Sequence, residues 1–496
     1  MIDINNVSFT YGEESTSGGI QEVNLHIKRG EFVVLTGTSG CGKTTLTRII
    51  NGLIPHYYEG NLSGEICLDG ENIAGKSIGS ISNKVASVFQ NPRSQFFSVD
   101  STGELAFQLE NRGVKPEIIE EKMRKVIREF HIDKLMGRSL FQLSGGEKQK
   151  LACAGAALSE AEIIVLDEPS SNLDIPTIEE IKKILLQWKK QGKTIIISEH
   201  RLYYLRDLMD RMILLKDGKI KKEYMRDEAV RLTTAELNHL GLRTLAIEDL
   251  KLAASERILS DEVVEFKPFS FYYKNGAEGI TMKNFSVHKG SVVAVVGHNG
   301  AGKSTMAKCI CGLEKKCKAQ MLMEGRTYNN KQMLTQCFLV MQDVNYQLFT
   351  ESNLDEVAIS LYNFKELGEE QREEKARNIL EQMNLGDQTE KHPMALSGGQ
   401  KQRVAISCAI ASGKNIIFFD EPTSGLDYDH MNQVAEQICE LSQKAATIFV
   451  ITHDMELILN CCTHVLHLEK GKNKELYELN ENTVGNLKVI FEEMPL

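Results

Sequence analysis

The sequence lacks the features that mark membrane-spanning, secreted or disulfide-stabilised proteins. No run approaches the ~18 uncharged apolar residues that a membrane-spanning helix needs, and residues 1–5 show no signal-peptide pattern. The 11 cysteines are an odd number without an export signal, which argues against a disulfide framework. With 9 prolines in 496 residues and no low-complexity tract, we expect a well-folded cytoplasmic protein of two or more domains.

Charge and cysteine spacing exclude two further kinds of site. The net charge of −10 provides no general attraction to polyphosphate, so no nucleic-acid partner is expected. Cys309, Cys311 and Cys317 lie close in sequence, but Cys-x-Cys on a helix points in divergent directions and no histidine stands at ligand spacing. We expect these thiols, and those of Cys461 and Cys462, to be buried and unbridged.

Two segments satisfy the pattern G-x-x-x-x-G-K-[ST] of a phosphate-binding loop, each after an apolar run. Their glycines let backbone N–H groups turn toward an anion, and the N-terminus of a following helix adds partial positive charge. The expected nucleotide-binding residues are Gly37, Thr38, Ser39, Gly40, Cys41, Gly42, Lys43, Thr44 and Thr45, and Gly297, His298, Asn299, Gly300, Ala301, Gly302, Lys303, Ser304 and Thr305.

Within each loop, the lysine is expected to reach the outer phosphates, and Thr44 or Ser304 to ligate Mg²⁺. Apolar residues at i, i+3, i+4 and i+7 follow each loop and predict one helix that includes all four. These residues are Leu46, Ile49, Ile50 and Leu53 in the first half, and Met306, Cys309, Ile310 and Leu313 in the second.

Aromatic residues precede both loops, and a glutamine follows each. Tyr11 and Tyr273 end apolar runs at nearly the same distance before the loops, where a ring can stack on adenine; a core aromatic is the alternative. Gln90 and Gln342 end later strands, and a glutamine there can touch a metal ion or the attacking water. Taken alone, each fits a surface glutamine as well.

The octets 143–150 and 396–403 share a Ser-Gly-Gly that opens a helix. Such a turn offers a hydroxyl and free backbone N–H groups to a phosphate. A helix N-cap accounts for the serine but not for the repeated octet. The residues concerned are Ser144, Gly145 and Gly146, and Ser397, Gly398 and Gly399.

Two apolar runs, 163–166 and 416–419, end in Asp-Glu, which is typical of buried parallel strands that carry acids at their C-terminal edge. Asp167 and Asp420 are expected to hold Mg²⁺ through water, and Glu168 and Glu421 to polarise the attacking water. Later β-rich runs end in histidines expected to contact the γ-phosphate. One offset of 253 residues relates Ser144 to Ser397 (397−144), Asp167 to Asp420 (420−167) and His200 to His453 (453−200).

With these motifs complete in both halves, the chain resembles the ATPase subunits of ABC transporters. Segments 52–60 (Gly-Leu-Ile-Pro-His-Tyr-Tyr-Glu-Gly) and 90–97 (Gln-Asn-Pro-Arg-Ser-Gln-Phe-Phe) resemble the energy-coupling-factor type, and segment 341–349 its fused tandem form. The resemblance implies an α/β fold with two P-loop NTPase domains, each with a mixed, mostly parallel sheet and a helical subdomain. It implies ATP and Mg²⁺ as cofactors, and ATP hydrolysis that energises uptake of a vitamin, a vitamin precursor or a transition-metal ion.

The resemblance also implies partners. A transmembrane energy-coupling protein and a separate substrate-binding membrane protein would hold the chain at the cytoplasmic face of the cell membrane as a peripheral subunit. In the family the partner groove lies between the Gln loop and the helical segment before the signature, which here places Phe96, Phe97 and Phe349 at its edge. Core packing of these rings is the alternative.

Each ATP site is expected to be composite, with Lys43 facing Ser397 and Lys303 facing Ser144. Whether the halves pair with each other or with those of a second copy stays open. The halves differ at Asn172 against Gly425, so unequal sites are compatible with the sequence.

The expected domains are residues 1–224 and 263–496, joined by a linker over 225–262. Thr233 and Glu236 form a capping-box pattern and Gly241 a stop signal, which predicts a short helix in the linker. Charged segments 117–130 and 366–383 are expected to be helical.

Four other classes compete with the importer. A soluble tandem ABC ATPase acting on ribosomes would have a longer, strongly charged arm between its halves. A fused sugar-importer ATPase typically lacks a standard second phosphate loop. This chain has Lys303, Ser304 and Glu421 in its second half, which argues against that class. A DNA-repair ATPase would carry zinc-binding cysteine pairs, and a catalytically dead structural protein would not keep two intact sets of catalytic residues.

Overall fold

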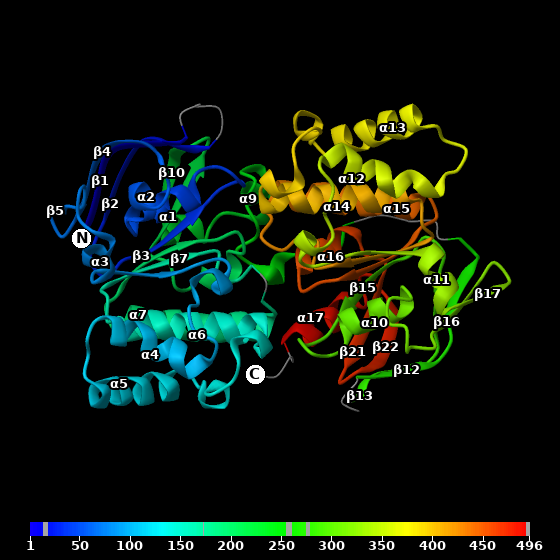
Figure 1. Cartoon of the computed structure of the whole chain (residues 1–496), viewed down its shortest axis with the longest axis horizontal. Coiled ribbons are helices and arrows are strands. Elements are labelled where there is room, and N and C mark those ends of the chain that lie inside the picture. The colour runs from blue at the N-terminus through cyan, green and yellow to red at the C-terminus, as the bar shows by residue number, and fades with distance from the viewer. Residues whose placement is uncertain (13–17, 172, 254–259, 274–277, 493–496) are drawn as a thin grey trace. The chain divides into compact units, whose positions relative to one another are not determined.

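The computed structural model describes residues 1–12, 18–171, 173–253, 260–273 and 278–492. Asn172 and linker residues 254–259 therefore lie outside the described residues. The chain forms two compact units, one made mainly of Met1–Asp249 and the other mainly of the residues from Leu250 onward (Figure 1). Each unit combines a six-stranded, mostly parallel sheet with antiparallel strands and helices, as the fold prediction required.

The first unit contains two sheets. The six-stranded sheet has the order β10-β9-β3-β8-β7-β6, and all its neighbours are parallel except β9 and β10. Its strands are β3 (Phe32–Thr36), β6 (Val85–Val88), β7 (Ile163–Asp167), β8 (Thr194–Ser198), β9 (Arg211–Lys216) and β10 (Lys219–Met225). The antiparallel sheet, in the order β2-β1-β4-β5, consists of β1 (Ile2–Tyr11), β2 (Gly19–Ile27), β4 (Gly60–Leu68) and β5 (Glu71–Asn72).

Helices cover both faces of the parallel sheet of this unit. Helix α1 contacts β2 of one sheet and β7 and β8 of the other, and the core between the sheets is apolar. A second apolar core lies between the sheet and α4 to α7. The helices are α1 (Lys43–Ile50), α2 (Leu53–His56), α3 (Ile78–Ser82), α4 (Ser101–Asn111), α5 (Pro116–Glu129), α6 (Gly145–Leu158) and α7 (Ile175–Lys190), with 3₁₀ turns η1 (Pro92–Gln95), η2 (Asp133–Leu135), η3 (Leu140–Gln142) and η4 (Tyr203–Leu205).

The second unit repeats this plan. Its parallel sheet has the order β18-β19-β20-β15-β21-β22, with β22 antiparallel. The strands are β15 (Val292–Val296), β18 (Cys337–Val340), β19 (Ile416–Asp420), β20 (Thr447–Ile451), β21 (His464–Glu469) and β22 (Lys472–Glu478). The remaining strands are β11 (Val263–Phe266), β12 (Phe269–Tyr272), β13 (Glu278–Met282), β14 (Phe285–His288), β16 (Gln320–Met323) and β17 (Arg326–Asn329).

Two helices of the second unit match their counterparts in the first in both length and spacing. Helices α5 and α13 both have 14 residues and α7 and α15 both have 16, and each pair starts 253 residues apart (369−116 and 428−175). The helices are α10 (Lys303–Ile310), α11 (Asn330–Gln336), α12 (Asn353–Ser360), α13 (Glu369–Gln382), α14 (Gly398–Ser412), α15 (Tyr428–Gln443), α16 (Met455–Cys461) and α17 (Val484–Glu492), with 3₁₀ turns η6 (Val344–Tyr346), η7 (Leu361–Asn363), η8 (Gly386–Gln388) and η9 (Pro393–Ala395).

The helix after each phosphate loop is shorter than predicted. Helix α1 ends at Ile50 and α10 at Ile310, so Leu53 and Leu313 lie outside them. Gly52 and Gly312 adopt left-handed conformations with φ of 77° and 75°, which end the helical path. The i+7 position of the apolar pattern therefore belongs to the following segment.

The linker contains the predicted short helix. Helix α9 (Thr234–His239) begins with a capping box between Thr233 and Glu236, and Gly241 follows it with φ of 74°. Helix α8 (Arg226–Ala229) precedes it and the 3₁₀ turn η5 (Ile247–Asp249) follows.

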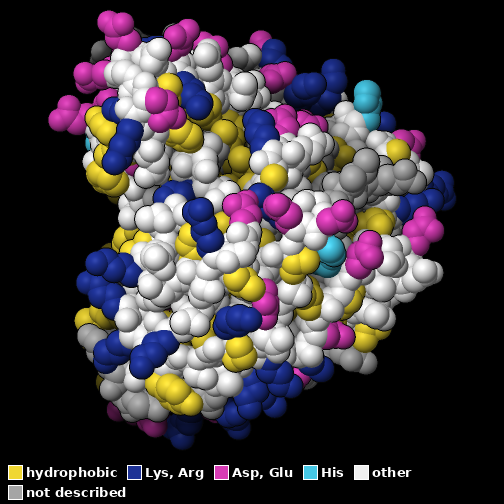
Figure 2. Space-filling view, turned by 90° about the vertical axis from the view of Figure 1, so that its right-hand side faces the viewer, with side chains coloured by type: hydrophobic (Ala, Val, Ile, Leu, Met, Phe, Trp, Pro, Cys, Tyr) yellow, Lys and Arg dark blue, Asp and Glu magenta, His cyan; other side chains and the backbone are white. Residues whose placement is uncertain are grey.

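No helix in the described residues is long and apolar enough to cross a membrane. Surface charge is mixed in sign. On the face of the second unit in Figure 2, acidic side chains gather at the top, where α13 lies in Figure 1, and Lys and Arg are more frequent lower down. This distribution agrees with a chain that is moderately acidic overall.

Candidate functional site

The two phosphate loops connect a buried strand to a helix in each unit. The first joins β3 to α1 and the second joins β15 to α10. Gly37 and Gly297 have φ of 145° and 146°, and a Cβ at either would lie 2.2 Å from the carbonyl oxygen of Leu215 or Leu468. Only glycine fits where the loop turns this close to the neighbouring strand.

Lys43 and Lys303 are buried and reach back across their loops. The Lys43 ammonium donates to the carbonyl oxygens of Gly37 at 2.9 Å and Thr38 at 3.1 Å, and no carboxylate among the described residues forms an ion pair with it. Lys303 donates to the corresponding carbonyls at 2.5 and 3.0 Å and also lies 3.1 Å from Nε2 of His453. A buried ammonium bonded to neutral carbonyls is a suitable partner for an anion.

The hydroxyls that follow the lysines contact the strand-end aspartates. Thr44 donates to Asp167 Oδ1 at 3.2 Å, and Ser198 at the end of β8 donates to the same oxygen. Burial raises the pKa of Asp167 above its usual range, as the neighbouring Glu168 does, while the two hydroxyl donors lower it. Burial likewise raises the pKa of Asp420, and a hydrogen bond from Ser304 opposes this change.

Glu168 lies between the glutamine and the histidine of the first unit. Gln90 Nε2 donates to Glu168 Oε2 at 2.7 Å, and His200 Nε2 lies 3.3 Å from Oε1. Burial raises the pKa of Glu168, but His200 and the nearby Lys43 charge outweigh it, so the pKa lies below its usual value. The carboxylate is therefore ionised and hydrogen-bonded at neutral pH.

The second unit holds its glutamate with different partners. Thr452 donates to Glu421 Oε2 at 3.3 Å, and His453 Nε2 lies 3.7 Å from Oε1. Gln342 is exposed, and the structure gives its side chain no hydrogen bond among the described residues. Of the three predicted residues of this cluster, Glu421 and His453 come together and Gln342 does not join them.

Ser144 and Ser397 are the N-caps of α6 and α14. The hydroxyl of each accepts from the backbone N–H of the residue three positions later, Glu147 or Gln400, at 3.2 and 3.4 Å. The capping boxes are complete, so the serines fix the helix starts and leave the first N–H groups of the glycines directed outward from the helix.

Tyr11 and Tyr273 are positioned alike. Each hydroxyl lies within hydrogen-bond distance of the threonine that ends the phosphate loop, 3.2 Å from Thr45 and 2.9 Å from Thr305. The rings therefore lie at the start of the helix that follows each loop.

A family model for ABC transporters matches residues 20–171 and 280–424, which is more than half of the chain. The chain belongs to the ABC transporter family. Its two units are therefore ABC ATPase domains, and the enzyme activity of the chain is that of an ATPase. The matched ranges contain both phosphate loops, both signatures and both Asp-Glu pairs.

Relatives of the same tandem form cover nearly the whole chain. Two Treponema denticola proteins named as ABC transporter ATP-binding proteins are 41% and 38% identical to it, covering 95% and 99% of this chain and 96% and 100% of their own lengths. A solved archaeal ribosome recycling factor is similar in fold, with a TM-score of 0.65 at 20% identity, over 98% of this chain and 92% of that one.

The residues present fit a magnesium nucleotide. Lys43 offers a buried ammonium to phosphate, and the loop glycines leave room for oxygens to approach the backbone. The hydroxyl and carboxylate oxygens of Thr44 and Asp167 are the hard ligands that Mg²⁺ prefers. Elsewhere in the described part of the chain, no group of three or more His, Cys, Asp or Glu side chains is arranged to hold a metal ion. All 11 cysteines are unbridged, and nine of them are buried.

A hollow of about 300 Å³ lies beside the Gln loop of the first unit. It is lined by α4, α6 and residues of the Gln-loop segment, including Phe97 and Phe107, whose rings stack at 5.2 Å. Phe97 is 74% exposed, so core packing is wrong for this residue, whereas Phe96 is partly buried against the core. Phe349 is 73% exposed in the second unit.

Two carboxylates that the sequence reasoning missed, the half-buried Glu104 and the buried Glu356, hold the Phe97 and Phe349 loops. Glu104 accepts from the backbone N–H of Phe97 at 2.9 Å, and Glu356 from that of Phe349 at 2.8 Å. Each glutamate also accepts from the next residue. The only signal available in the sequence was a glutamate seven residues after each phenylalanine.

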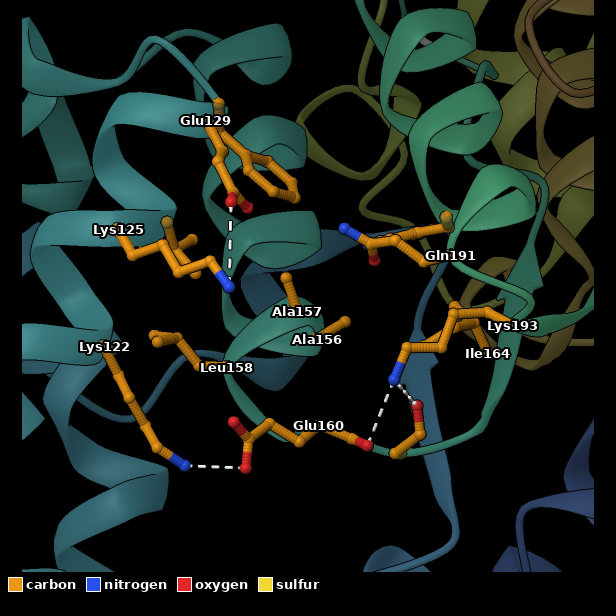
Figure 3. A pocket seen from close by; sticks show the side chains of 14 residues that line it. Lys122, Lys125, Glu129, Ala156, Ala157, Leu158, Glu160, Ile164, Gln191 and Lys193 are labelled. Atoms are coloured by element: carbon orange, nitrogen blue, oxygen red, sulfur yellow. Dashed lines mark hydrogen bonds and ion pairs between the residues drawn. The ribbon is translucent and has the colours of Figure 1, made fainter. Parts of the chain in front are cut away.

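A second hollow, of about 420 Å³, lies near the N-terminal ends of strands β7 and β8 (Figure 3). It is bordered by Ile164 near the start of β7 and by Lys193 just before β8, away from the strand ends that carry Asp167. Its lysines are engaged: Lys122 pairs with Glu160 at 2.6 Å, and Lys193 donates to backbone carbonyls. These lysines bind the segment that follows α6, and no residue predicted to bind nucleotide lines this hollow.

Proposed function

We propose that the chain is the ATP-binding and ATP-hydrolysing subunit of an energy-coupling-factor importer. It would work at the cytoplasmic face of the cell membrane and energise uptake of a vitamin, a vitamin precursor or a transition-metal ion. In this arrangement a separate membrane protein selects the cargo. The proposal rests on two exposed phenylalanines, Phe97 and Phe349. Each lies beside the Gln loop of its unit, and equivalent hydrogen bonds to a glutamate hold the two backbones.

In the proposed site each residue acts on bound ATP in a defined way. Lys43 and Lys303 would hold the outer phosphates, and the oxygens of Thr44, Asp167, Ser304 and Asp420 would hold Mg²⁺, which supplies charge neutralisation on the phosphates when bound. Glu168 is ionised and oriented by Gln90, which suits a group that accepts a proton from water. Glu421 would have the same role in the second half.

We further propose that each site is completed by the signature of another half. The glycines after Ser144 and Ser397 keep free N–H groups at the helix start, a suitable donor set for a terminal phosphate. Head-to-tail pairing would place Ser397 opposite Lys43 and Ser144 opposite Lys303. The partner half would come from the same chain or from a second copy.

The proposed contact with a transmembrane partner rests on the structure of the two loops that contain Phe97 and Phe349. Gln95 accepts from the N–H of Phe89 at 3.0 Å, and Gln347 accepts from that of Met341 at 3.1 Å, so both loops close in one way. An aromatic ring that stays in solvent forgoes the stabilising free energy that its burial would contribute. An amphipathic helix of a transmembrane partner laid into the hollow would cover the rings.

The competing function is a soluble ATPase acting on ribosomes. The archaeal ribosome recycling factor shares the fold of this chain, but an identity of 20% supports nothing beyond the fold. The relatives at about 40% identity are named as transporter subunits, which favours the importer.

Affinity purification from detergent-solubilised membranes tests the proposal. The chain should recover a polytopic membrane protein, and Phe97→Asp combined with Phe349→Asp should lower recovery at least about tenfold, the scale of losing an apolar hot spot. Ile118→Asp is the matched control, because this exposed residue of α5 lies outside the hollow. ATP binding should persist in every variant.

Two results would overturn the transport proposal. Undiminished recovery by the double Phe variant would remove the proposed docking surface. Co-purification of ribosomal subunits without any membrane protein would support the ribosomal function instead.

A further inference from the structure

Segment 52–60, which joins α1 to β4, differs in sequence from residues 312–320, which join α10 to β16 in the second half. It begins with α2, and the N–H groups of Tyr57 and Tyr58 both donate to the carbonyl of Leu53, at 2.8 and 3.1 Å. It ends at Gly60, which pairs with Tyr11 in the β4–β1 register. A Cβ at Gly60 would lie 2.2 Å from the carbonyl oxygen of Thr10, so glycine lets the segment pack this close to β1.

This packing places two side chains around Tyr11. The ring of Tyr58 lies edge-on to that of Tyr11, with centroids 6.2 Å apart. The Arg48 guanidinium carbon lies 4.0 Å from the centre of the Tyr58 ring, and Arg48 Nη1 donates to the Tyr11 hydroxyl at 3.1 Å. Tyr11 is thus held from α1 and from segment 52–60 at once, in addition to its contact with Thr45.

Among the residues that the structure describes, no cation or second tyrosine ring holds the tyrosine of the second half. Tyr273 is 47% exposed; among the described residues its ring lies edge-on to Phe271 at 5.3 Å and beside Gly279, and its hydroxyl reaches that of Thr305. Lys308 occupies the position of Arg48, five residues after the loop lysine (308−303 and 48−43), and is exposed. Residues 312–320, which stand at the position of segment 52–60, contain no aromatic residue.

We infer that Tyr58 and Arg48 are positioning residues that brace Tyr11 against the adenine ring, so that the first half recognises the base of the nucleotide more strongly than the second half. A side chain already fixed in its bound orientation loses less freedom on binding than an exposed one. The Arg48 guanidinium lies over the Tyr58 ring and also donates to the Tyr11 hydroxyl, so this one cation fixes the positions of both rings. The inference rests on the nucleotide binding proposed above.

Equilibrium binding to the full chain tests the brace, with ATP and inorganic tripolyphosphate as probes in the presence of Mg²⁺. Tripolyphosphate carries the phosphates without the base. The parent chain for these measurements and each of its variants carry Lys303→Ala, which removes nucleotide binding at the second site. Tyr58→Ala and Arg48→Lys should each weaken ATP binding about fivefold, the effect expected for one cation–π contact or one hydrogen bond, and leave tripolyphosphate binding unchanged.

Two features of the variants separate positioning from general damage. Tyr58→Phe keeps the ring and should bind ATP as the parent chain does. Arg48 also lowers the pKa of Asp167 through its charge. Arg48→Lys retains that charge and installs the residue type of the second half, so that a change in ATP binding reports the lost contacts. In the reciprocal chain with Lys43→Ala, the preference for ATP over tripolyphosphate should be about fivefold smaller than in the Lys303→Ala chain.

The outcomes are distinct. Equal losses for ATP and tripolyphosphate would mean that segment 52–60 supports the phosphate loop, and no loss for either would mean that Tyr11 needs no brace; either result overturns the inference. Failure of the Lys303→Ala chain to bind ATP, or ATP binding that survives Lys43→Ala in that chain, would instead overturn the proposed nucleotide site itself.

Discussion

Replacement of Glu168 by glutamine should separate ATP binding from hydrolysis in the first half. Glutamine keeps the shape of the side chain, and its amide oxygen can still accept from Gln90 Nε2, which now lies 2.7 Å from Glu168 Oε2. The change removes the negative charge facing His200 and the lone pair that accepts a proton from water. Loss of a general base costs about 10²- to 10⁴-fold in rate.

The effect on folding should be small by comparison. Glu168 is 9% exposed, and the substitution loses a charge-assisted contact with His200 at 3.3 Å, a loss of roughly 1.5–3 kcal/mol. The substitution also removes the cost of burying a carboxylate, which offsets much of that loss. A net change of about 1 kcal/mol shifts Tm by roughly 2–4 °C in a domain of this size.

Single-turnover phosphate release with nucleotide binding measured in parallel provides the assay. Glu421→Gln is the matched change in the second half, and the double variant should bind ATP and remain closed. Hydrolysis at the parent rate in both single variants would refute the role given to these glutamates. Loss of ATP binding in either would show that the carboxylate holds the nucleotide site together.

Three further predictions use other parts of the chain. Ser397→Arg should impair nucleotide handling at the Lys43 site, and unchanged binding and turnover there would exclude head-to-tail pairing. Trp188→Leu, which installs the residue found at the equivalent position of the second half, should destabilise the first unit by roughly 2–4 kcal/mol in calorimetry, because the 2%-exposed indole fills the core. In the native protein at pH 8, a thiol reagent should react first with Cys67 and Cys439, because the other nine cysteines are buried; rapid modification of all 11 would contradict this burial.

Local sequence patterns predicted the parts of the fold whose causes are local. The Thr233–Glu236 capping box depends on neighbours within a few residues, and the phosphate loops and Asp-Glu strand ends are recognisable as short sequence patterns. The position of Glu168 next to Gln90 was also predictable in outline, because β6 and β7 are adjacent parallel strands that end at one edge.

Contacts between distant segments were not predictable in this way. Tyr58 reaches Tyr11 because β1 pairs with β4, an arrangement across more than forty residues that no periodicity encodes. The exposure of Phe97 beside the partly buried Phe96 depends on Glu104, which ties the loop down through two backbone N–H groups. The predicted helix after each loop was too long because a single glycine ended it.

The constant spacing between α5 and α13 and between α7 and α15 makes the two halves exchangeable in blocks. The block from the start of α5 to the end of α7 has the same length as the block from the start of α13 to the end of α15, so either can replace the other without adding or removing residues. Chimeric chains with two first-half or two second-half blocks would then show which differences between the halves are functional and which are neutral drift between duplicated sequences.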